Sequence, residues 1–341
     1  MVSTGKNSLD FLRLIAAAFV LYSHQYALLG LAEPSFFGWN SFGGAGVTIF
    51  FFLSGMLVWT SWARDSDVRR FFQRRCLRIF PALWVVVLLS IGILGPALTT
   101  FSLPKFFTAA DTWRYLTTAI LLPRNVLPGV FEGNPFPNAI NGSLWTLPVE
   151  FFCYITVMAA GLLRQRQKGF LLGMVLVVMV LLATYEPLLV GTRFAPHLEM
   201  LAIFWWGVIY GYISTSARAT LKHKQWELLA LAIAVLFFAL LGPRSEERLA
   251  ITLFAMAAVF LAQRTDLGAC LTDRIGDLSY GIYIYAFPVQ QIMVYWLGAS
   301  CNSFAEMFFA SSVVTIALAY LSWHLVERPA LRFKPRAVLS P

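Results

Sequence analysis

Long apolar stretches alternate with short polar segments along nearly the whole chain. A stretch of about 20 apolar residues is long enough to cross a bilayer as an α-helix. The pattern therefore predicts an all-α, polytopic transmembrane helical bundle of about ten spans, at 9–30, 46–63, 79–97, 144–163, 169–185, 198–215, 226–242, 248–263, 278–298 and 303–326.

Composition and charge support this interpretation. The chain is 59% hydrophobic and 13% charged, whereas soluble domains carry about 25% charged residues. If the N-terminus is inside, 19 of the 26 Lys and Arg residues lie in or beside cytoplasmic segments and six in outer ones. The positive-inside rule then predicts that both termini are cytoplasmic. Basic loops of this kind set topology and contact membrane lipid, so we expect no nucleic-acid partner.

The domain organisation follows from the loops. We expect a single transmembrane domain over 1–335, a long extracytoplasmic loop at 98–143 within it, and a short cytoplasmic tail at 336–341. The loop is rich in Pro, Asn, Gly and aromatic residues, which suits either a sugar-binding face or an interfacial aromatic belt. The segment 113–122 is too short to span and is expected to be interfacial or re-entrant. The four His and four Cys residues show no ligand spacing, so neither a metal site nor a disulfide framework is predicted.

Two ionisable residues in the first span are the strongest candidates for chemistry. Arg13 and His24 are eleven residues apart, which is about three helical turns and places both on one face, about 16 Å apart along the axis. Ionisable groups at membrane depth are costly and often functional. The competing interpretation is that Arg13 extends to the headgroups and His24 hydrogen-bonds a neighbouring helix.

Further candidates lie in the third and ninth spans. Arg75 and Arg78, three residues apart at the cytoplasmic edge, form a pair of guanidinium groups suited to phosphate, although plain topology-setting charge explains them too. Arg13 is expected at the same level. In the segment DLSYGIY at 277–283, Ser279 and Tyr280 offer hydroxyls, and we group them with the arginines as candidate cofactor-binding residues.

Glu150 is the third candidate catalytic residue. It lies about six residues, or about 9 Å, below the outer edge of the fourth span, and His24 is about as far from the outer end of its own span. A carboxylate beside an imidazole can form a general-base pair, so equal depth predicts that Glu150 lies near His24. Pairing of Glu150 with another buried group is the alternative. For Glu327, near the end of the tenth span, an ion pair with Arg13 or Arg78 is favoured.

Six segments taken together resemble the acyltransferase 3 family of membrane O-acyltransferases. In chain order they are Arg13-x10-His24, GGAGVTIFFFLSG at 43–55, RCLRIFPALW at 75–84, SLWTLPVE at 143–150, DLSYGIY at 277–283 and VERP at 326–329. The resemblance implies transfer of an acyl group, usually acetyl, from cytosolic acyl-CoA to a hydroxyl of an extracytoplasmic acceptor such as a glycan. It implies that His24 is the essential histidine, that Arg13 is its partner, and that Arg75 and Arg78 contact the CoA phosphates.

The residues and the resemblance lead to one mechanism. Acyl-CoA, a co-substrate and not a permanently bound cofactor, is expected to enter from the cytoplasm, and His24 to deprotonate the acceptor hydroxyl. A covalent acyl-His24 intermediate is an alternative to direct transfer. Some family members carry a fused hydrolase-like domain for which this chain has no room after Pro329, which leaves open a separate periplasmic partner. The expected location is a bacterial inner membrane. The alternative function is a secondary transporter or exporter that uses the buried His, Glu and Gln groups as a proton or substrate path.

Overall fold

The computed structural model describes residues 8–166, 195–215, 245–298 and 303–335. These residues form helices and loops, with one isolated bridge between Phe36 and Asn40. The longer helices are α1 (Leu9–Leu28), α2 (Phe42–Arg64), α3 (Val68–Leu89), α7 (Thr146–Arg166), α9 (Ala195–Thr215), α11 (Ser245–Ala262), α13 (Ser279–Leu297) and α14 (Phe304–Ser322). Shorter ones are α4 (Gly95–Leu98), α5 (Leu103–Thr108), α6 (Ala110–Arg114), α12 (Ala269–Ile275) and α15 (Arg328–Leu331).

The prediction of an all-α membrane protein is confirmed. Five helical segments are long and apolar enough to cross a membrane: Leu9–Leu28, Phe42–Arg64, Val68–Leu98, Gly142–Leu162 and Phe304–Leu331. Three further predicted spans coincide with α9, α11 and α13, while those at 169–185 and 226–242 lie outside the described residues. The total of ten spans and the cytoplasmic termini stay predictions. The third span was predicted from 79, but its helix begins at Val68, so the basic segment before 79 is part of it.

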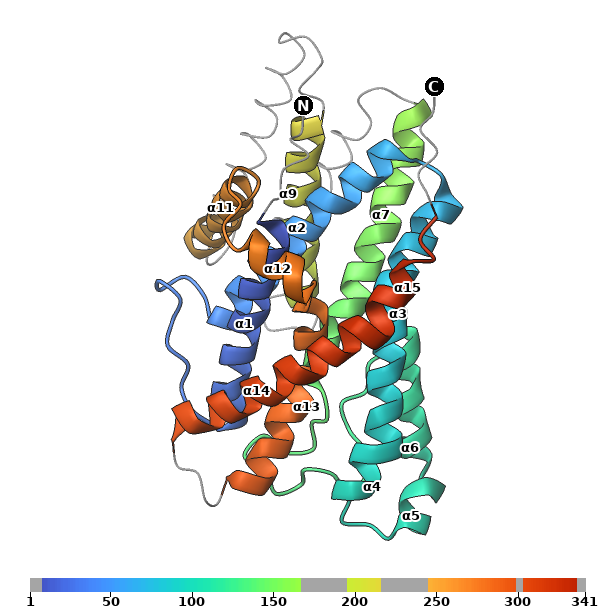
Figure 1. Cartoon of the computed structure of the whole chain (residues 1–341), viewed down its shortest axis with the longest axis vertical. Coiled ribbons are helices and arrows are strands. Elements are labelled where there is room, and N and C mark those ends of the chain that lie inside the picture. The colour runs from blue at the N-terminus through green and yellow to red at the C-terminus, as the bar shows by residue number, and fades with distance from the viewer. Residues whose placement is uncertain (1–7, 167–194, 216–244, 299–302, 336–341) are drawn as a thin grey trace.

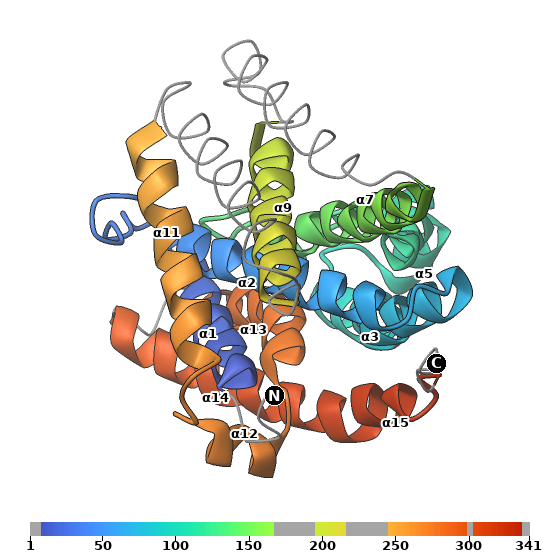
Figure 2. The ribbon, with the colours of Figure 1, turned by 90° about the horizontal axis from the view of Figure 1, so that it is seen from above.

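Helix α13 lies inside the bundle and packs mainly against α14 and α1 (Figure 2). All its residues from Ser279 to Gln291 are buried. Its polar side chains therefore need partners, because water is not there to provide them. Gln290 donates to the Leu21 carbonyl of α1 at 2.8 Å and to Gln25 at 3.1 Å. The buried amides predicted in this span thus connect helices.

The long loop at 98–143 is tied to the same helix. Gln291 donates to the carbonyls of Phe136 and Ala139 at 2.8 and 2.9 Å. The Asn134 amide donates to the side chain of Gln291 at 2.7 Å, and Asn141 donates to the Ile284 carbonyl at 2.8 Å. The segment 129–143 therefore packs on α13 at what we call the loop end of the bundle. The predicted short element at 113–122 is the end of α6 followed by a 3₁₀ helix, Tyr115–Ile120.

Close approach of two helices shapes the bundle beside the site. A Cβ on Gly55 of α2 would collide with the Phe204 carbonyl of α9, and one on Gly207 would collide with the Phe52 carbonyl. Small residues let transmembrane backbones approach in this way. Gly55 thus serves packing, while its neighbour Ser54 faces the other way, into a cavity. Helix α14 crosses the bundle obliquely and leads into α15, which packs on α3 (Figure 1).

Candidate active site

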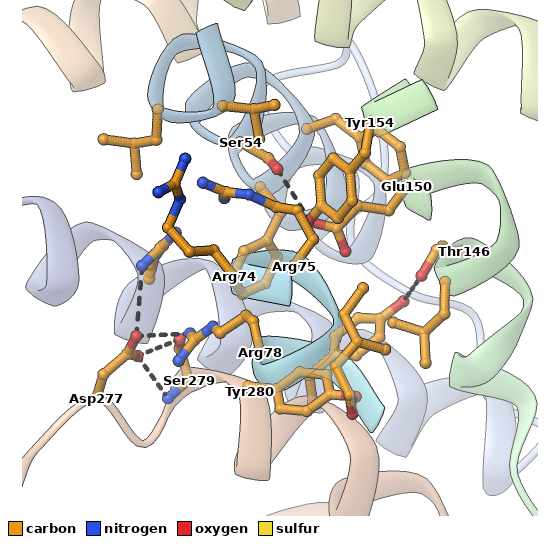
Figure 3. A pocket seen from close by; sticks show the side chains of 18 of the residues that line it. Ser54, Arg74, Arg75, Arg78, Thr146, Glu150, Tyr154, Asp277, Ser279 and Tyr280 are labelled. Carbon is orange, nitrogen blue, oxygen red and sulfur yellow. Dashed lines mark hydrogen bonds and ion pairs between the residues drawn. The ribbon is translucent and has the colours of Figure 1, made fainter. Parts of the chain in front are cut away.

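One cavity of about 430 Å³ lies between α1, α2, α3, α7 and α13. Its polar and charged lining residues are Asp10, Arg13, Ser54, Ser61, Arg74, Arg75, Arg78, Thr146, Glu150, Tyr154, Asp277, Ser279, Tyr280, Tyr283 and Lys334. Arg13, Leu331 and Lys334 mark one end, where α1 begins and α15 finishes, which we call the mouth end. Arg13, Arg75 and Arg78, which the sequence places at one level, all line this cavity, and Figure 3 shows Arg75 and Arg78 in its wall.

A buried carboxylate organises two of these arginines. Asp277 lies 2.6 Å from the Arg78 guanidinium and 3.3 Å from that of Arg13. Ser279 donates to the same carboxylate through its hydroxyl at 2.5 Å and its backbone N–H at 3.2 Å. Burial disfavours the charged carboxyl, but the charges of Arg78 and then Arg13 outweigh it and lower the pKa of Asp277 to about 2. Asp277 therefore stays ionised at neutral pH.

The two hydroxyls grouped with the arginines are already bonded within the protein. Ser279 binds Asp277, and the Tyr280 hydroxyl donates to the Ile79 carbonyl of α3 at 2.8 Å. The Arg78 guanidinium lies over the Tyr280 ring, with its central carbon 5.8 Å from the ring centroid. Both residues line the cavity. In this structure they hold Asp277 and Arg78 in place, and cofactor binding by their hydroxyls stays a prediction.

Arg75 differs from its neighbours on α3. Its guanidinium stacks over the rings of Phe71 and Tyr154, 5.5 and 5.6 Å from their centroids. It makes no ion pair with a described residue, and its buried Nε lacks a hydrogen-bond partner there. Arg74, in contrast, is 2.8 Å from Asp65 in the α2–α3 loop. Arg75 is thus a cation facing the cavity with unused donors.

Glu150 lies deeper in the cavity, and its partners are not those predicted. Oε1 accepts hydrogen bonds from Ser54 at 3.0 Å and from Tyr154 at 2.5 Å (Figure 3). Tyr154 is four residues on and so shares its helix face. The expected pairing with His24 is wrong, because α7 packs mainly against α2, α3 and α9 and not against α1. The alternative, another buried partner, holds.

His24 lies outside this cavity. Its ring contacts Phe287 edge-on, with centroids 5.2 Å apart, and its buried Nδ1 has no hydrogen-bond partner among described residues. The lining residue of α13 nearest the loop end is Tyr283. Phe287 is four residues further, which is about 6 Å along the helix. The cavity therefore stops about one turn short of His24, although both belong to the same core.

Sequence reasoning missed two residues of the site, Tyr154 and Lys334, and the partner of a third residue, Glu327, which lies outside the cavity lining. Tyr154 could have been found from its i,i+4 spacing to Glu150. Lys334 was counted only as a loop charge, because nothing in the sequence shows that α15 packs on α3 beside the cavity. Glu327 was expected in an ion pair but accepts from Ser322 at 2.9 Å, and its buried Oε2 has no partner among the described residues.

Comparison with known proteins identifies the family of this chain. The acyltransferase 3 family model, described as an acyltransferase domain, matches residues 6–324. The chain belongs to the acyltransferase 3 family. The family agrees with the resemblance drawn from the six segments, and it makes the chain an acyltransferase of the membrane.

Full-length relatives agree with the family. An O-acetyl transferase of Shigella phage Sf6 is 33% identical, with 98% of this chain and 99% of the relative covered. Nodulation protein 10 of Rhizobium leguminosarum bv. viciae is 29% identical, with 98% and 96% covered. The exopolysaccharide production protein ExoZ of Rhizobium meliloti is 25% identical, with 85% and 90% covered. No solved structure matches the chain.

Proposed function

We propose that this acyltransferase moves an acyl group, most simply acetyl, from cytosolic acyl-CoA to a hydroxyl of a glycan or similar acceptor outside a bacterial inner membrane. One observation carries the proposal: the cavity is lined by cations at the mouth end and by Glu150 deeper in, and it ends about one turn short of His24. Phosphates of the donor fit guanidinium and ammonium groups. The printed names of the relatives, an O-acetyl transferase and an exopolysaccharide protein, support the reaction and the acceptor class.

Each residue of the site has a role that follows from its position along the bundle. Arg75, Arg78, Arg13 and Lys334 hold the donor phosphates at the mouth end. The pantetheine arm then extends past Tyr280 toward Glu150. His24, at the loop end, takes the proton of the acceptor hydroxyl as that oxygen attacks the thioester carbonyl. The new C–O ester bond forms as the C–S bond breaks, and the protonated His24 gives its proton to the departing CoA thiolate, which restores the neutral imidazole. Holding both substrates in line supplies much of the rate.

The transporter alternative loses its main support. The buried amides that suggested a relay, Gln290 and Gln291, are bonded to backbone carbonyls of α1 and the outer loop. They do not line the cavity. The family likewise favours acyl transfer.

The test is CoA release by purified protein in lipid nanodiscs, with acetyl-CoA and extracted surface glycan as acceptor. We expect His24→Ala to lose at least about 100-fold in turnover, as removal of a general base does. His324→Ala is the matched control, since His324 packs on Tyr320 away from the cavity. Near-normal turnover by His24→Ala, in protein that elutes as a single folded species, would contradict the proposal.

A further inference from the structure

The cavity and His24 are separated by a defined group of side chains. On α2, the lining residue nearest the loop end is Val47; on α7 it is Thr146, and on α13 it is Tyr283. On α1 the lining stops at Arg13. Gly43 of α2 packs against Ser23, the neighbour of His24, so Val47 is about one turn nearer the mouth than His24. The positions of lining residues on α2 and on α13 therefore both place the end of the cavity about one helical turn from His24.

Tyr283 closes that gap from the centre. Its hydroxyl donates to the Ser143 carbonyl at 2.8 Å and lies 2.6 Å from the Thr146 hydroxyl. Its ring meets Phe50 of α2, with centroids 5.8 Å apart. The side chain is therefore held across the bundle, from α13 to the start of α7, with an aromatic ring of α2 against it.

Phe287 forms a second layer, one turn toward the loop end. Its ring lies between His24 and Gly142. The centroids of the Phe287 and His24 rings are 5.2 Å apart, and a Cβ added to Gly142 would come within 2.6 Å of the Phe287 ring. Phe287 is buried, and so is Tyr283. Two aromatic layers therefore lie between the cationic cavity and the imidazole.

A barrier at this level has a physical reason. A water-filled path from one side of the membrane to the other would let ions and protons through, and it would expose the thioester to water. Aromatic and apolar constrictions prevent this by excluding water. Acyl transfer across the same level needs the constriction to open.

We propose that Tyr283 and Phe287 form a gate between the donor cavity and His24, closed in this structure and opened when the Tyr283 hydroxyl leaves Ser143 and Thr146. Only the names given to the two sides of the gate, the donor cavity and the catalytic His24, rest on the proposed function. The gate itself is tested by access and not by turnover, so its failure is distinguishable from failure of the proposed reaction.

The experiment measures reaction of single cysteines with a charged, membrane-impermeant methanethiosulfonate. The native cysteines at 76, 153, 270 and 301 are first replaced by serine. Sealed vesicles carry either Ser61→Cys, which lies in the cavity wall and identifies the mouth side, or His24→Cys. We expect His24→Cys to react from the opposite side, and at least 10-fold more slowly from the mouth side than Ser61→Cys.

Opening the gate should remove that difference. Adding Tyr283→Ala and Phe287→Ala to His24→Cys should raise the mouth-side rate at least 10-fold. Tyr285→Ala is the matched control, a buried tyrosine of the same helix that does not line the cavity. If the double alanine variant does not fold, Tyr283→Phe with Thr146→Val removes the 2.6 Å contact at little cost in shape and should raise the rate about 3-fold. Equal rates for Ser61→Cys and His24→Cys from the mouth side, or an unchanged rate in a folded opened variant, would overturn the gate.

Discussion

Arg75 and Arg78 lie one turn apart on α3 and both face the cavity, but the structure predicts opposite consequences when each is removed. Arg78 is bound 2.6 Å from the buried carboxylate of Asp277. Arg75 has no described carboxylate partner and stacks on two rings. Arg78→Ala leaves Asp277 with the more distant Arg13, at 3.3 Å. Arg75→Ala breaks no ion pair with a described residue, and Glu150, with which Arg75 interacts electrostatically, keeps its hydrogen bonds from Ser54 and Tyr154.

Magnitudes separate the two variants. Breaking a buried ion pair by removing one partner costs about 3–5 kcal/mol, and the remaining contact of Asp277 with Arg13 places Arg78→Ala near the lower value. Arg75→Ala loses ring contacts worth about 1 kcal/mol and gains the desolvation cost of an unpaired guanidinium. Its stability should therefore change by less than about 1 kcal/mol. If Arg75 binds a donor phosphate, its loss removes about 1.5–3 kcal/mol of binding, or about 10- to 150-fold in apparent KM.

The assay combines thermal unfolding in nanodiscs with CoA-release kinetics over a range of acetyl-CoA concentrations. Arg75→Ala should keep the wild-type Tm and raise the apparent KM more than it lowers kcat, since it acts on a remote part of the donor. Arg78→Ala should lower the Tm. Arg69→Ala, an exposed arginine of the same helix outside the cavity, is the control for charge alone. The reasoning is refuted if Arg75→Ala unfolds as readily as Arg78→Ala, or if its apparent KM stays at the wild-type value.

Three further predictions concern single side chains. Glu150→Gln keeps the oxygen that accepts from Ser54 and Tyr154 but replaces the second one, so turnover should fall at least about 10-fold while the Tm stays within a few degrees. Gln291→Leu removes three hydrogen bonds to the loop at 98–143 and should cost about 2–4 kcal/mol, seen as a lower Tm and faster proteolysis within that loop. Partial burial and the like charges of the cavity arginines lower the pKa of Lys334 to about 8. A bound phosphate favours the ammonium, so the apparent KM for acetyl-CoA should be lowest below pH 8 and rise above it, and Lys334→Arg should abolish that rise.

The first span shows how far sequence reasoning reaches. The helix containing Arg13 and His24 was predictable, because a single apolar stretch sets both its length and the depth of each residue. Their relation to the cavity was not. Arg13 lines it and His24 does not, although the two share a helix face, because the neighbours of that face change along its length from Asp277 to Phe287.

Glu150 shows the same limit of prediction from sequence. Its depth was predictable and its partner was not, since depth is one coordinate and the lateral order of helices supplies the others. The sequence gives that order only where a small residue forces a contact, as at Gly55 against α9. The ion pair of Asp277 with Arg78, 199 residues apart, depends wholly on which helices become neighbours.

The distribution of charge at the mouth end identifies which cations are left for an anionic substrate. Arg74 is paired with Asp65, and a hydrogen bond from Arg70 holds the pKa of that carboxyl well below its usual range. Arg13 and Arg78 share Asp277. Arg75, on α3, and Lys334, which follows α15, line the same cavity without a described ion-pair partner. We therefore expect an incoming phosphate to be attracted first to the space between these two residues, while Arg78 and Arg13 at the same end of the cavity stay paired with Asp277.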